Sequence, residues 1–143
     1  MKYFNTQLEF SGTTLLSADE AKSLLTEQER KYKYHWWLRS PGYYSYYAVG
    51  INYYGDVIRT GYHVNYGYCI RPALQIANLG DFKVGDVFSI GEYYFKIISP
   101  ELAWLYKQDI GTDYFDEKSN NYVASHIKAV IDSWFEKLKE EMI

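Results

Sequence analysis

The protein is 143 residues long, the size of a single domain, and its one cysteine excludes an internal disulfide and any metal site built on several thiolates. Its 15 basic and 18 acidic residues give a net charge of −3, whereas proteins that track the phosphates of a nucleic acid normally carry a basic surplus. We therefore expect one domain over residues 1–143 that does not bind nucleic acid.

No apolar run of the sequence approaches the ~20 residues that a membrane-spanning helix needs. The first residues, Met1 to Gln7, also lack the apolar stretch of a secretory signal peptide. We expect no membrane insertion, and a location in the cytoplasm or on a virion.

The first half of the chain predicts a helix set among short strands. Residues 13–16 are typical of a strand, and Ser17 with Glu20 has the spacing of a capping box at the start of a helix over 18–30. A buried strand is expected at 35–39, closed by the turn 40–42. Further elements follow in quick succession: strands at 45–52, 56–60 and 68–76, with hairpin turns at 53–56 and 59–62.

Residues 78–81 are the best internal boundary and divide the chain into the parts 1–79 and 80–143. An amphipathic helix is expected from about 122 to 141, capped by Asn121 or Ser125. The order of elements has no strand–helix repeat and is typical of an α+β fold with two helices and mostly antiparallel strands. Before that helix, the second part predicts strands at 87–90, 93–99 and 102–106, then a polar loop over 107–121.

Tyrosine is unusually frequent, with 17 residues. Successive strand residues point to opposite faces, so a pair such as Tyr43–Tyr44 cannot enter one core together. At least half of the rings in such a window should therefore be exposed or in loops, although a tyrosine-rich sheet packed on a core is the alternative. Nine tyrosines share one window: Tyr43, Tyr44, Tyr46, Tyr47, Tyr53, Tyr54, Tyr62, Tyr66 and Tyr68.

The rest of this window is mostly small and polar, a mixture that is typical of binding loops. Tyrosine supplies a large, rigid contact with one polar tip, while neighbouring polar side chains select among ligands. We expect a ligand-binding surface that combines the nine tyrosines with Asn52, Asp56, Arg59, His63 and Asn65.

The residues that could carry chemistry form no recognised catalytic motif. No nucleophile motif accompanies His35, His63 or His126, and His35 is expected to pack beside the tryptophan pair 36–37. Acids in the polar loop could bind calcium, but without the spacing of a helix–loop–helix site they are more simply solvated charges: Asp109, Asp113, Asp116 and Glu117. We expect no catalytic residues, no metal site and no cofactor, and hence no enzyme.

Two motifs resemble a known family. Residues 36–42 (WWLRSPG) and residues 70–74 (IRPAL) resemble the paired motifs of an uncharacterised bacterial and phage domain family with a C-type-lectin-like fold. Relatives of this kind serve as variable proteins of diversity-generating retroelements, where adenine-directed mutagenesis turns asparagine codons into Tyr, Ser, Asp, His or Gly. The window 43–68 has this composition. Cys69 departs from the family, which usually has glycine there.

The second half resembles the opposite end of the same family. Residues 85–98 are similar to its opening hairpin and residues 119–128 to the start of its first helix, yet in ordinary members this part comes first. The resemblance implies a circular permutant that closes within one chain, which we prefer, or a homodimer that exchanges halves. The fold is also that of the formylglycine-generating oxidases, but their chemistry needs two cysteines.

We therefore expect a non-enzymatic protein that binds a protein or cell-surface ligand through residues 43–68, a surface that the resemblance implies is diversified. The alternative is a structural or assembly module of a phage or surface complex, with the tyrosine face as a subunit interface. Sugar binding or hydrolysis through stacked tyrosines is a third option. Arg39 and Arg71 should fix carbonyls or acids beneath the loops. The scaffold should rest on Trp36, Trp37, Leu38, Leu74, Trp104 and Trp134.

Overall fold

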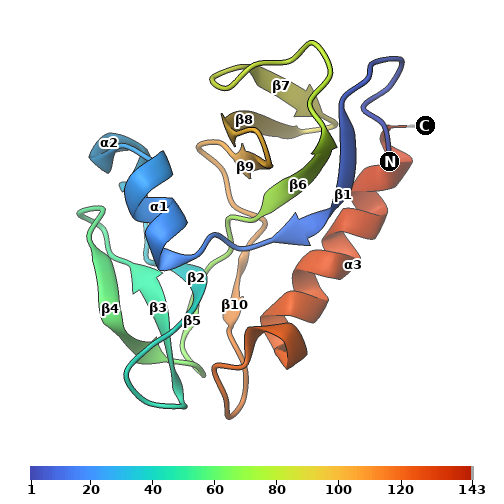
Figure 1. The fold of residues 1–143 in the computed structure, drawn as a ribbon. Coiled ribbons are helices and arrows are strands. Elements are labelled where there is room, and N and C mark those ends of the chain that lie inside the picture. Colours follow the sequence, from blue (N-terminus) through green and yellow to red (C-terminus); the bar gives the residue numbers. More distant parts are fainter. Residues whose placement is uncertain (143) are drawn as a thin grey trace.

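The structure is a computed structural model that describes residues 1–142. Two five-stranded sheets lie one beyond the other, and a long helix runs along one side of the molecule (Figure 1). Within the described residues, every neighbouring pair of strands is antiparallel except β2 and β5, which are parallel at a single bridge. The predicted α+β class with mostly antiparallel strands is thus confirmed.

Sheet A has the strand order β1-β6-β9-β8-β7, and sheet B has the order β10-β5-β2-β3-β4. In sheet A the strands are β1 (Glu9–Thr14), β6 (Ala73–Asn78), β9 (Leu102–Leu105), β8 (Tyr93–Ser99) and β7 (Val87–Ile90). In sheet B they are β10 (Thr112–Tyr114), β5 (Gly67–Cys69), β2 (Trp36–Pro41), β3 (Tyr47–Ile51) and β4 (Val57–His63). The helices are α1 (Ala18–Leu24), α2 (Glu27–Arg30), the short 3-10 helix η1 (Tyr122–Ala124) and α3 (His126–Glu140).

Both halves of the chain contribute to both sheets. Strand β9 from the second half lies between β6 and β8, and β10 pairs with β5. Helix α3 passes along sheet A and ends beside the N-terminal segment (Figure 1). Met142 accordingly packs in the same buried cluster as Leu8 and Phe10. Residues 78–81 therefore connect two parts of the chain, 1–79 and 80–142, that pack together in the same two sheets.

The first helical region differs from its prediction. The capping box of Ser17 and Glu20 is present, with both hydrogen bonds formed at 2.8 and 3.0 Å. The single helix expected over 18–30 is wrong, because Leu25 is extended and Thr26 opens a second capping box with Glu29. Two threonine- or serine-led caps in succession make two short helices, α1 and α2.

The C-terminal helix begins later than its apolar pattern suggests. The Ser125 side chain accepts from the backbone N–H of Lys128, which confirms one of the two predicted caps and starts α3 at His126. Residues 122–124 form η1 instead, so Val123 is 82% exposed and does not join the buried stripe. No helix within residues 1–142 is both long enough and apolar enough to span a bilayer.

Several predicted strands have different limits. The strand expected at 13–16 is β1, and the one expected at 68–76 is two strands in different sheets, β5 and β6, joined through Arg71 and Pro72. The turn expected at 59–62 is wrong, because β4 continues to His63 and the chain turns at 64–66. The turn expected at 40–42 is also wrong, because β2 continues to Pro41 and the chain turns at 43–46. The loop expected over 107–121 contains β10, a strand that its polar sequence does not reveal.

Sheet B is packed on both of its faces. Since successive strand residues alternate, Trp36 points to a cluster beneath α1 while Trp37 points to one with Phe115 and Ile127. The expected scaffold residues Trp36, Trp37, Leu38, Leu74 and Trp104 are fully buried, and Trp134 is half-buried. This packing on two sides gives the strands that carry the tyrosines a rigid base.

Candidate functional site

Eight of the nine tyrosines of the predicted window meet at sheet B, in a connected group of rings that we call the aromatic patch. Neighbouring rings have centroids 4.6–6.5 Å apart and mostly tilted or edge-to-face geometry, the arrangement that aromatic pairs prefer. The patch consists of Tyr34, His35, Tyr43, Tyr44, Tyr46, Tyr47, Tyr53, Tyr62, His63, Tyr66 and Tyr68.

The floor of the patch is formed by Tyr62 and Tyr68. Tyr68 is 8% exposed, and its ring centroid lies 4.9 Å from those of both Trp37 and Tyr62. Tyr62 can lie flat over β3 because residue 50 is glycine, where a Cβ atom would stand 2.8 Å from the Tyr62 ring. Burial, with smaller effects from the surrounding tyrosines, raises the pKa of Tyr68 to about 12, so its hydroxyl is neutral at neutral pH.

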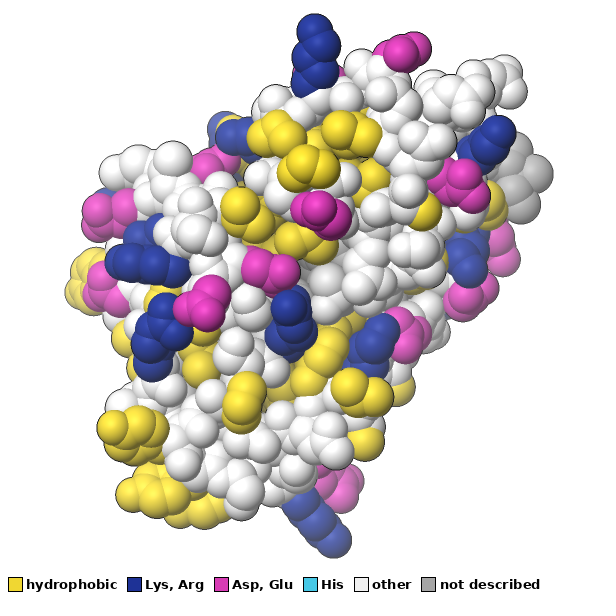
Figure 2. All heavy atoms as spheres, in the orientation of Figure 1, with side chains coloured by type: hydrophobic (Ala, Val, Ile, Leu, Met, Phe, Trp, Pro, Cys, Tyr) yellow, Lys and Arg dark blue, Asp and Glu magenta, His cyan; other side chains and the backbone are white. Residues whose placement is uncertain are grey.

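The rim of the patch is open to solvent. Tyr43 is 80% exposed, and Tyr44, Tyr46, Tyr53 and Tyr66 are also exposed. Tyr54 is 71% exposed but has no ring contact within the described chain, so it lies outside the patch. Tyr47 and Tyr62 are half-buried, so only Tyr68 among the nine predicted tyrosines is buried. The sequence-based expectation that at least half of these rings are exposed is met. Figure 2 shows hydrophobic side chains gathered at the lower left, where the ends of β3 and β4 lie in Figure 1.

The polar residues predicted for the site divide into two groups. His63 belongs to the patch, with its ring centroid 5.3 Å from that of Tyr46 and 5.8 Å from that of Tyr66, and Asn65 is exposed in the adjoining turn. Asn52 instead closes the β3–β4 turn, where its side-chain oxygen accepts from the backbone N–H groups of Tyr54 and Asp56 at 3.0 Å. This Asn52 oxygen is therefore occupied within the protein.

Asp56 and Arg59 also have partners within the chain. The Asp56 carboxylate accepts from the Asn52 amide nitrogen at 3.3 Å, while Arg59 forms an ion pair with Asp19 of α1 at 3.1 Å. Three residues along β4 from Tyr62, Arg59 points to the opposite face. The structure thus places Arg59 outside the aromatic patch that it was predicted to join.

Two members of the patch were missed as candidate site residues. Tyr34 was not singled out, and His35 was expected to pack beside the tryptophan pair. His35 instead lies among Tyr53, Tyr62 and Tyr68, with ring centroids 4.6–5.3 Å away. Burial lowers the pKa of His35 below its ordinary value. Strand alternation relates His35 to Trp37, but only the pairing of β2 with β3 and β5 brings them to the tyrosines.

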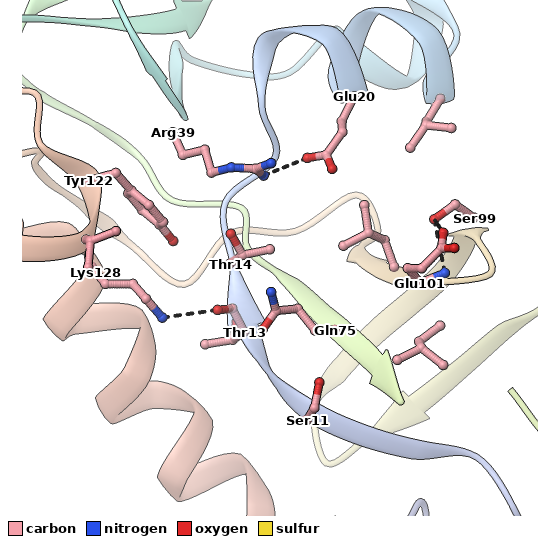
Figure 3. A pocket seen from close by; sticks show the side chains of 14 residues that line it. Ser11, Thr13, Thr14, Glu20, Arg39, Gln75, Ser99, Glu101, Tyr122 and Lys128 are labelled. Carbon is pink, nitrogen blue, oxygen red and sulfur yellow. Dashed lines mark hydrogen bonds and ion pairs between the residues drawn. The ribbon is translucent and has the colours of Figure 1, made fainter. Parts of the chain in front are cut away.

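A broad groove lies elsewhere, with β1 as its floor and α1 and α3 on either side (Figure 3). Its volume is about 850 Å³, and most of its charged groups have partners within the protein. Arg39 pairs with Glu20 at 2.6 Å, and the Lys128 ammonium donates to the Thr13 carbonyl at 3.2 Å. Because these groups already have partners, the groove offers a ligand less than the exposed rings of the patch do.

The groups considered for chemistry form no catalytic or metal-binding arrangement within the described residues, and the buried Nδ1 atoms of His35 and His63 have no hydrogen-bond partner there. No cluster of three or more His, Cys, Asp or Glu side chains that could hold a metal ion occurs in residues 1–142. Asp113 pairs with His126 at 2.9 Å, but no Ser, Thr or Cys side chain in the described chain is hydrogen-bonded to that histidine. Cys69 is buried in β5, and burial raises the pKa of its thiol to about 11, which disfavours the reactive thiolate.

The fold and site together define an α+β domain with a rigid sheet that presents aromatic rings to solvent. A family model described as a domain of unknown function (DUF6273) matches residues 3–78, which are 76 of the 143 residues, and the protein belongs to this family. The matched region runs through β6 and contains the whole aromatic patch. No curated protein and no solved structure matches the chain.

Proposed function

We propose that the protein is a non-enzymatic ligand-binding domain with a C-type-lectin-like fold, and that its aromatic patch binds a protein or cell-surface ligand. The observation that carries this proposal is the contrast within the patch, where a buried floor supports an exposed rim. A monomeric protein rarely exposes so many clustered rings unless they contact something else.

The chemistry of the rim suits recognition. A tyrosine side chain has two torsions to fix on binding, so it supplies contact area at a low entropic cost. The floor rings Tyr62 and Tyr68 are already held in place by Gly50 and Trp37, which lowers that cost further. Tyrosine anchors of this kind commonly lose ~2 kcal/mol or more of binding free energy when truncated.

The arrangement of the chain supports a circularly permuted order. The end of α3 lies beside the N-terminal segment, as a permutation of a domain with neighbouring termini requires (Figure 1). The pairs β6–β9 and β5–β10 also join the two halves within one chain. These contacts favour a closed monomer over a homodimer that exchanges halves.

The diversified character of the surface can be tested in the neighbouring DNA. We expect a near-identical repeat of the segment that encodes residues 43–68, differing from it only at adenines, beside a reverse-transcriptase gene. If both are absent, the patch remains a binding surface but its diversification by a retroelement is refuted.

Binding itself can be tested with matched tyrosine variants. Wild-type protein would be screened on a glycan array and on a protein array, beside the double variant Tyr44→Ser/Tyr53→Ser. The control is Tyr94→Ser, because Tyr94 is 54% exposed on sheet A and Tyr44 is 55% exposed in the patch. We expect hits that the double variant loses and the control keeps. Hits that survive in the double variant would contradict the proposal.

The same variants test the assembly alternative. A module that uses the patch as a permanent subunit interface self-associates tightly, and its dimer dissociates in Tyr44→Ser/Tyr53→Ser but not in Tyr94→Ser. Light scattering on a sizing column measures this directly. We expect a monomer for all three proteins, whereas a tight patch-dependent dimer would replace the ligand-binding proposal by the assembly function.

A further inference from the structure

A buried cation without a carboxylate partner lies on the opposite face of β2 from the aromatic patch. Arg71, in the segment that joins β5 to β6, is 1% exposed. Its guanidinium carbon lies 4.2 Å from the ring centroid of Tyr32, 4.7 Å from that of Trp36 and 4.3 Å from that of Trp104. No acid within residues 1–142 forms an ion pair with it. The aromatic faces support the charge at close range, and the more distant carboxylates of Asp109 and Glu29 also favour it.

The hydrogen-bond donors of this site are only partly used. Arg71 Nε donates to the carbonyl of Gln108 at 3.1 Å, as expected for an arginine that fixes a carbonyl. The buried Nη1 atom of Arg71 has no partner among the described residues, and neither has the indole Nε1 of Trp104. Buried donors are nearly always satisfied, and leaving them unpaired costs free energy.

The guanidinium keeps its charge in this setting. Burial lowers the pKa of Arg71 to about 10, which still leaves the side chain protonated at neutral pH. An arginine fork is the side chain best shaped to bind a carboxylate through two parallel hydrogen bonds. The site therefore combines a positive charge at neutral pH with two hydrogen-bond donors, Arg71 Nη1 and Trp104 Nε1, that have no acceptor among the described residues.

A cavity of about 340 Å³ adjoins Arg71, between α2 and the end of β9. Aromatic side chains form its walls, namely those of Tyr32, Trp104 and Tyr106. Two further lining cations, Lys31 and Lys107, form no ion pair within the described chain. The lining acid Glu29 is bound by the Lys96 ammonium at 2.6 Å and so leaves the excess of positive charge in place.

The backbone of Lys107, which also lines the cavity, has an unusual conformation. Its backbone φ is +59°, in the left-handed region that non-glycine residues seldom occupy. This conformation follows directly after Tyr106 and brings the Lys107 ammonium to 5.0 Å from the Tyr106 ring centroid. Such local strain tends to occur where a protein positions a side chain for binding.

We propose that this cavity binds a small organic carboxylate with a flat apolar body. The carboxylate accepts hydrogen bonds from Arg71 and the Trp104 indole, while the flat body lies against the aromatic walls and the lysines add long-range attraction. Trp36, which stacks on Arg71, points to the face of β2 opposite to Trp37. This second site is therefore separate from the aromatic patch, and the proposal does not depend on ligand binding there.

Benzoate is a suitable probe, and benzamide is its neutral counterpart of the same shape. Titration of the whole protein would be followed through the indole N–H signal of Trp104 in nitrogen–proton NMR spectra. We expect saturable shifts with benzoate, none with benzamide, and binding of acetate at least about tenfold weaker because it lacks the flat body. Equal response to benzoate and benzamide would overturn the proposal, and so would no response to either.

Inorganic phosphate distinguishes a site for a different anion. If phosphate saturates the Trp104 signal and benzoate does not, the cavity is a phosphate site and the carboxylate proposal is wrong. If neither anion binds, Arg71 is a structural cation held by its rings and the Gln108 carbonyl, which also overturns the proposal.

A charge-reversal pair tests the residues. Lys107→Glu should weaken benzoate binding at least about tenfold, because it places a like charge at the cavity. Lys22→Glu is the control, since it makes the same charge change on the exposed side of α1, outside the cavity lining. Benzoate should raise the melting temperature of wild type and Lys22→Glu but not of Lys107→Glu. Equal weakening in both variants would contradict a specific site.

Arg71→Lys keeps the charge but removes the planar fork. We expect benzoate binding at least about tenfold weaker in this variant, with the Lys22→Glu protein unaffected. Undiminished binding by folded Arg71→Lys would exclude the guanidinium as the carboxylate partner. Should Arg71→Lys fail to fold, the Lys107→Glu comparison still decides the proposal.

Discussion

Sheets A and B use aromatic side chains in opposite ways. The core against sheet A contains a row of buried phenylalanine rings: Phe95 is fully buried, and its centroid lies 5.6 Å from that of Phe88, which is stacked in turn on Phe10. In the aromatic patch at sheet B the rings are tyrosine and histidine, and most of the tyrosines are exposed. The hydroxyl group explains the difference, because it can remain in water while the ring offers its apolar faces.

The two sets of rings therefore have different roles: one stabilises the fold, and the other is free to contact a ligand. The rings of sheet A gain free energy by leaving water when the chain folds. The rim rings of sheet B have yet to leave water, so their burial free energy is available to a ligand. A site built this way tolerates changes at its rim, because few rim residues support the fold.

The sharpest test of the contrast is removal of a sealed ring. Phe95→Ala should lower the free energy of unfolding by about 3–5 kcal/mol, since it removes a fully buried ring and leaves a cavity. Urea denaturation measures the loss. The control Tyr94→Ala removes the neighbouring exposed ring and should cost less than about 1 kcal/mol. Similar losses for the two variants would show that sheet A does not depend on its sealed face.

A smaller effect is expected at the floor of the patch. Gly50→Ala places a methyl group 2.8 Å from the Tyr62 ring and 3.1 Å from the Trp36 carbonyl oxygen, so the ring must shift. We expect a loss of about 1–3 kcal/mol and a displaced Tyr62 ring signal in NMR spectra.

Gly67 is the matched control for Gly50, because a methyl group there meets nothing within 4 Å. Gly67→Ala should be neutral or should stabilise by up to about 1 kcal/mol through the unfolded chain. If Gly50→Ala proved equally harmless, the Tyr62 ring would not depend on the close approach that defines the floor.

The free energy of unfolding should also depend on pH through His35, at the centre of the patch. Burial lowers the pKa of His35 below its ordinary value of 6.5, so the unfolded chain binds this proton more readily than the folded protein. The contribution of His35 to the stability of the fold is therefore complete above pH 6.5, and it is lost as the pH falls through the pKa of His35 in the folded protein.

The measurement is the difference in unfolding free energy between wild type and His35→Phe, at about pH 7.5 and about pH 5. Wild type should lose more stability on acidification than the variant, since every other titrating group is common to both proteins. A difference that stays constant with pH would mean that His35 is not desolvated by its ring neighbours.

The smallest effect should come from the rim. Tyr43 is 80% exposed, so Tyr43→Ser should change the free energy of unfolding by no more than about 0.5 kcal/mol. The urea experiment used for Phe95→Ala applies here, with wild type as the reference. A loss above about 1 kcal/mol would show that the rim supports the fold and would blur the distinction between the two sheets.

Local signals in the sequence predicted local structure well. The Ser17–Glu20 capping box, the Ser125 cap and the neighbouring strands at 87–90 and 93–99 were found from local patterns alone, because each depends on near neighbours in the chain. The same reasoning missed the second box at Thr26, although its spacing was equally readable. Strand β10 left no signal, since three polar residues form a strand there only by pairing with β5.

The candidate site was predicted in part. Alternation along a strand implied exposed tyrosines, and most of them are exposed. It could not assign Arg59 to the α1 side or draw His35 into the patch, because both depend on which strands are neighbours. Arg71 was predicted to bind a carbonyl, and it does, but three rings contributed by distant segments gave it an aromatic enclosure that no spacing indicates.

The sequence by itself determined the α+β class, two of the predicted turns, two helix caps and the concentration of tyrosine in one window, since these follow from composition and near-neighbour chemistry. Only the tertiary structure decided which rings face solvent, which acid meets which base, and how both halves of the chain build two sheets. The physical reason is that strand pairing and burial join residues far apart in the chain, and such contacts leave no fixed spacing in the sequence.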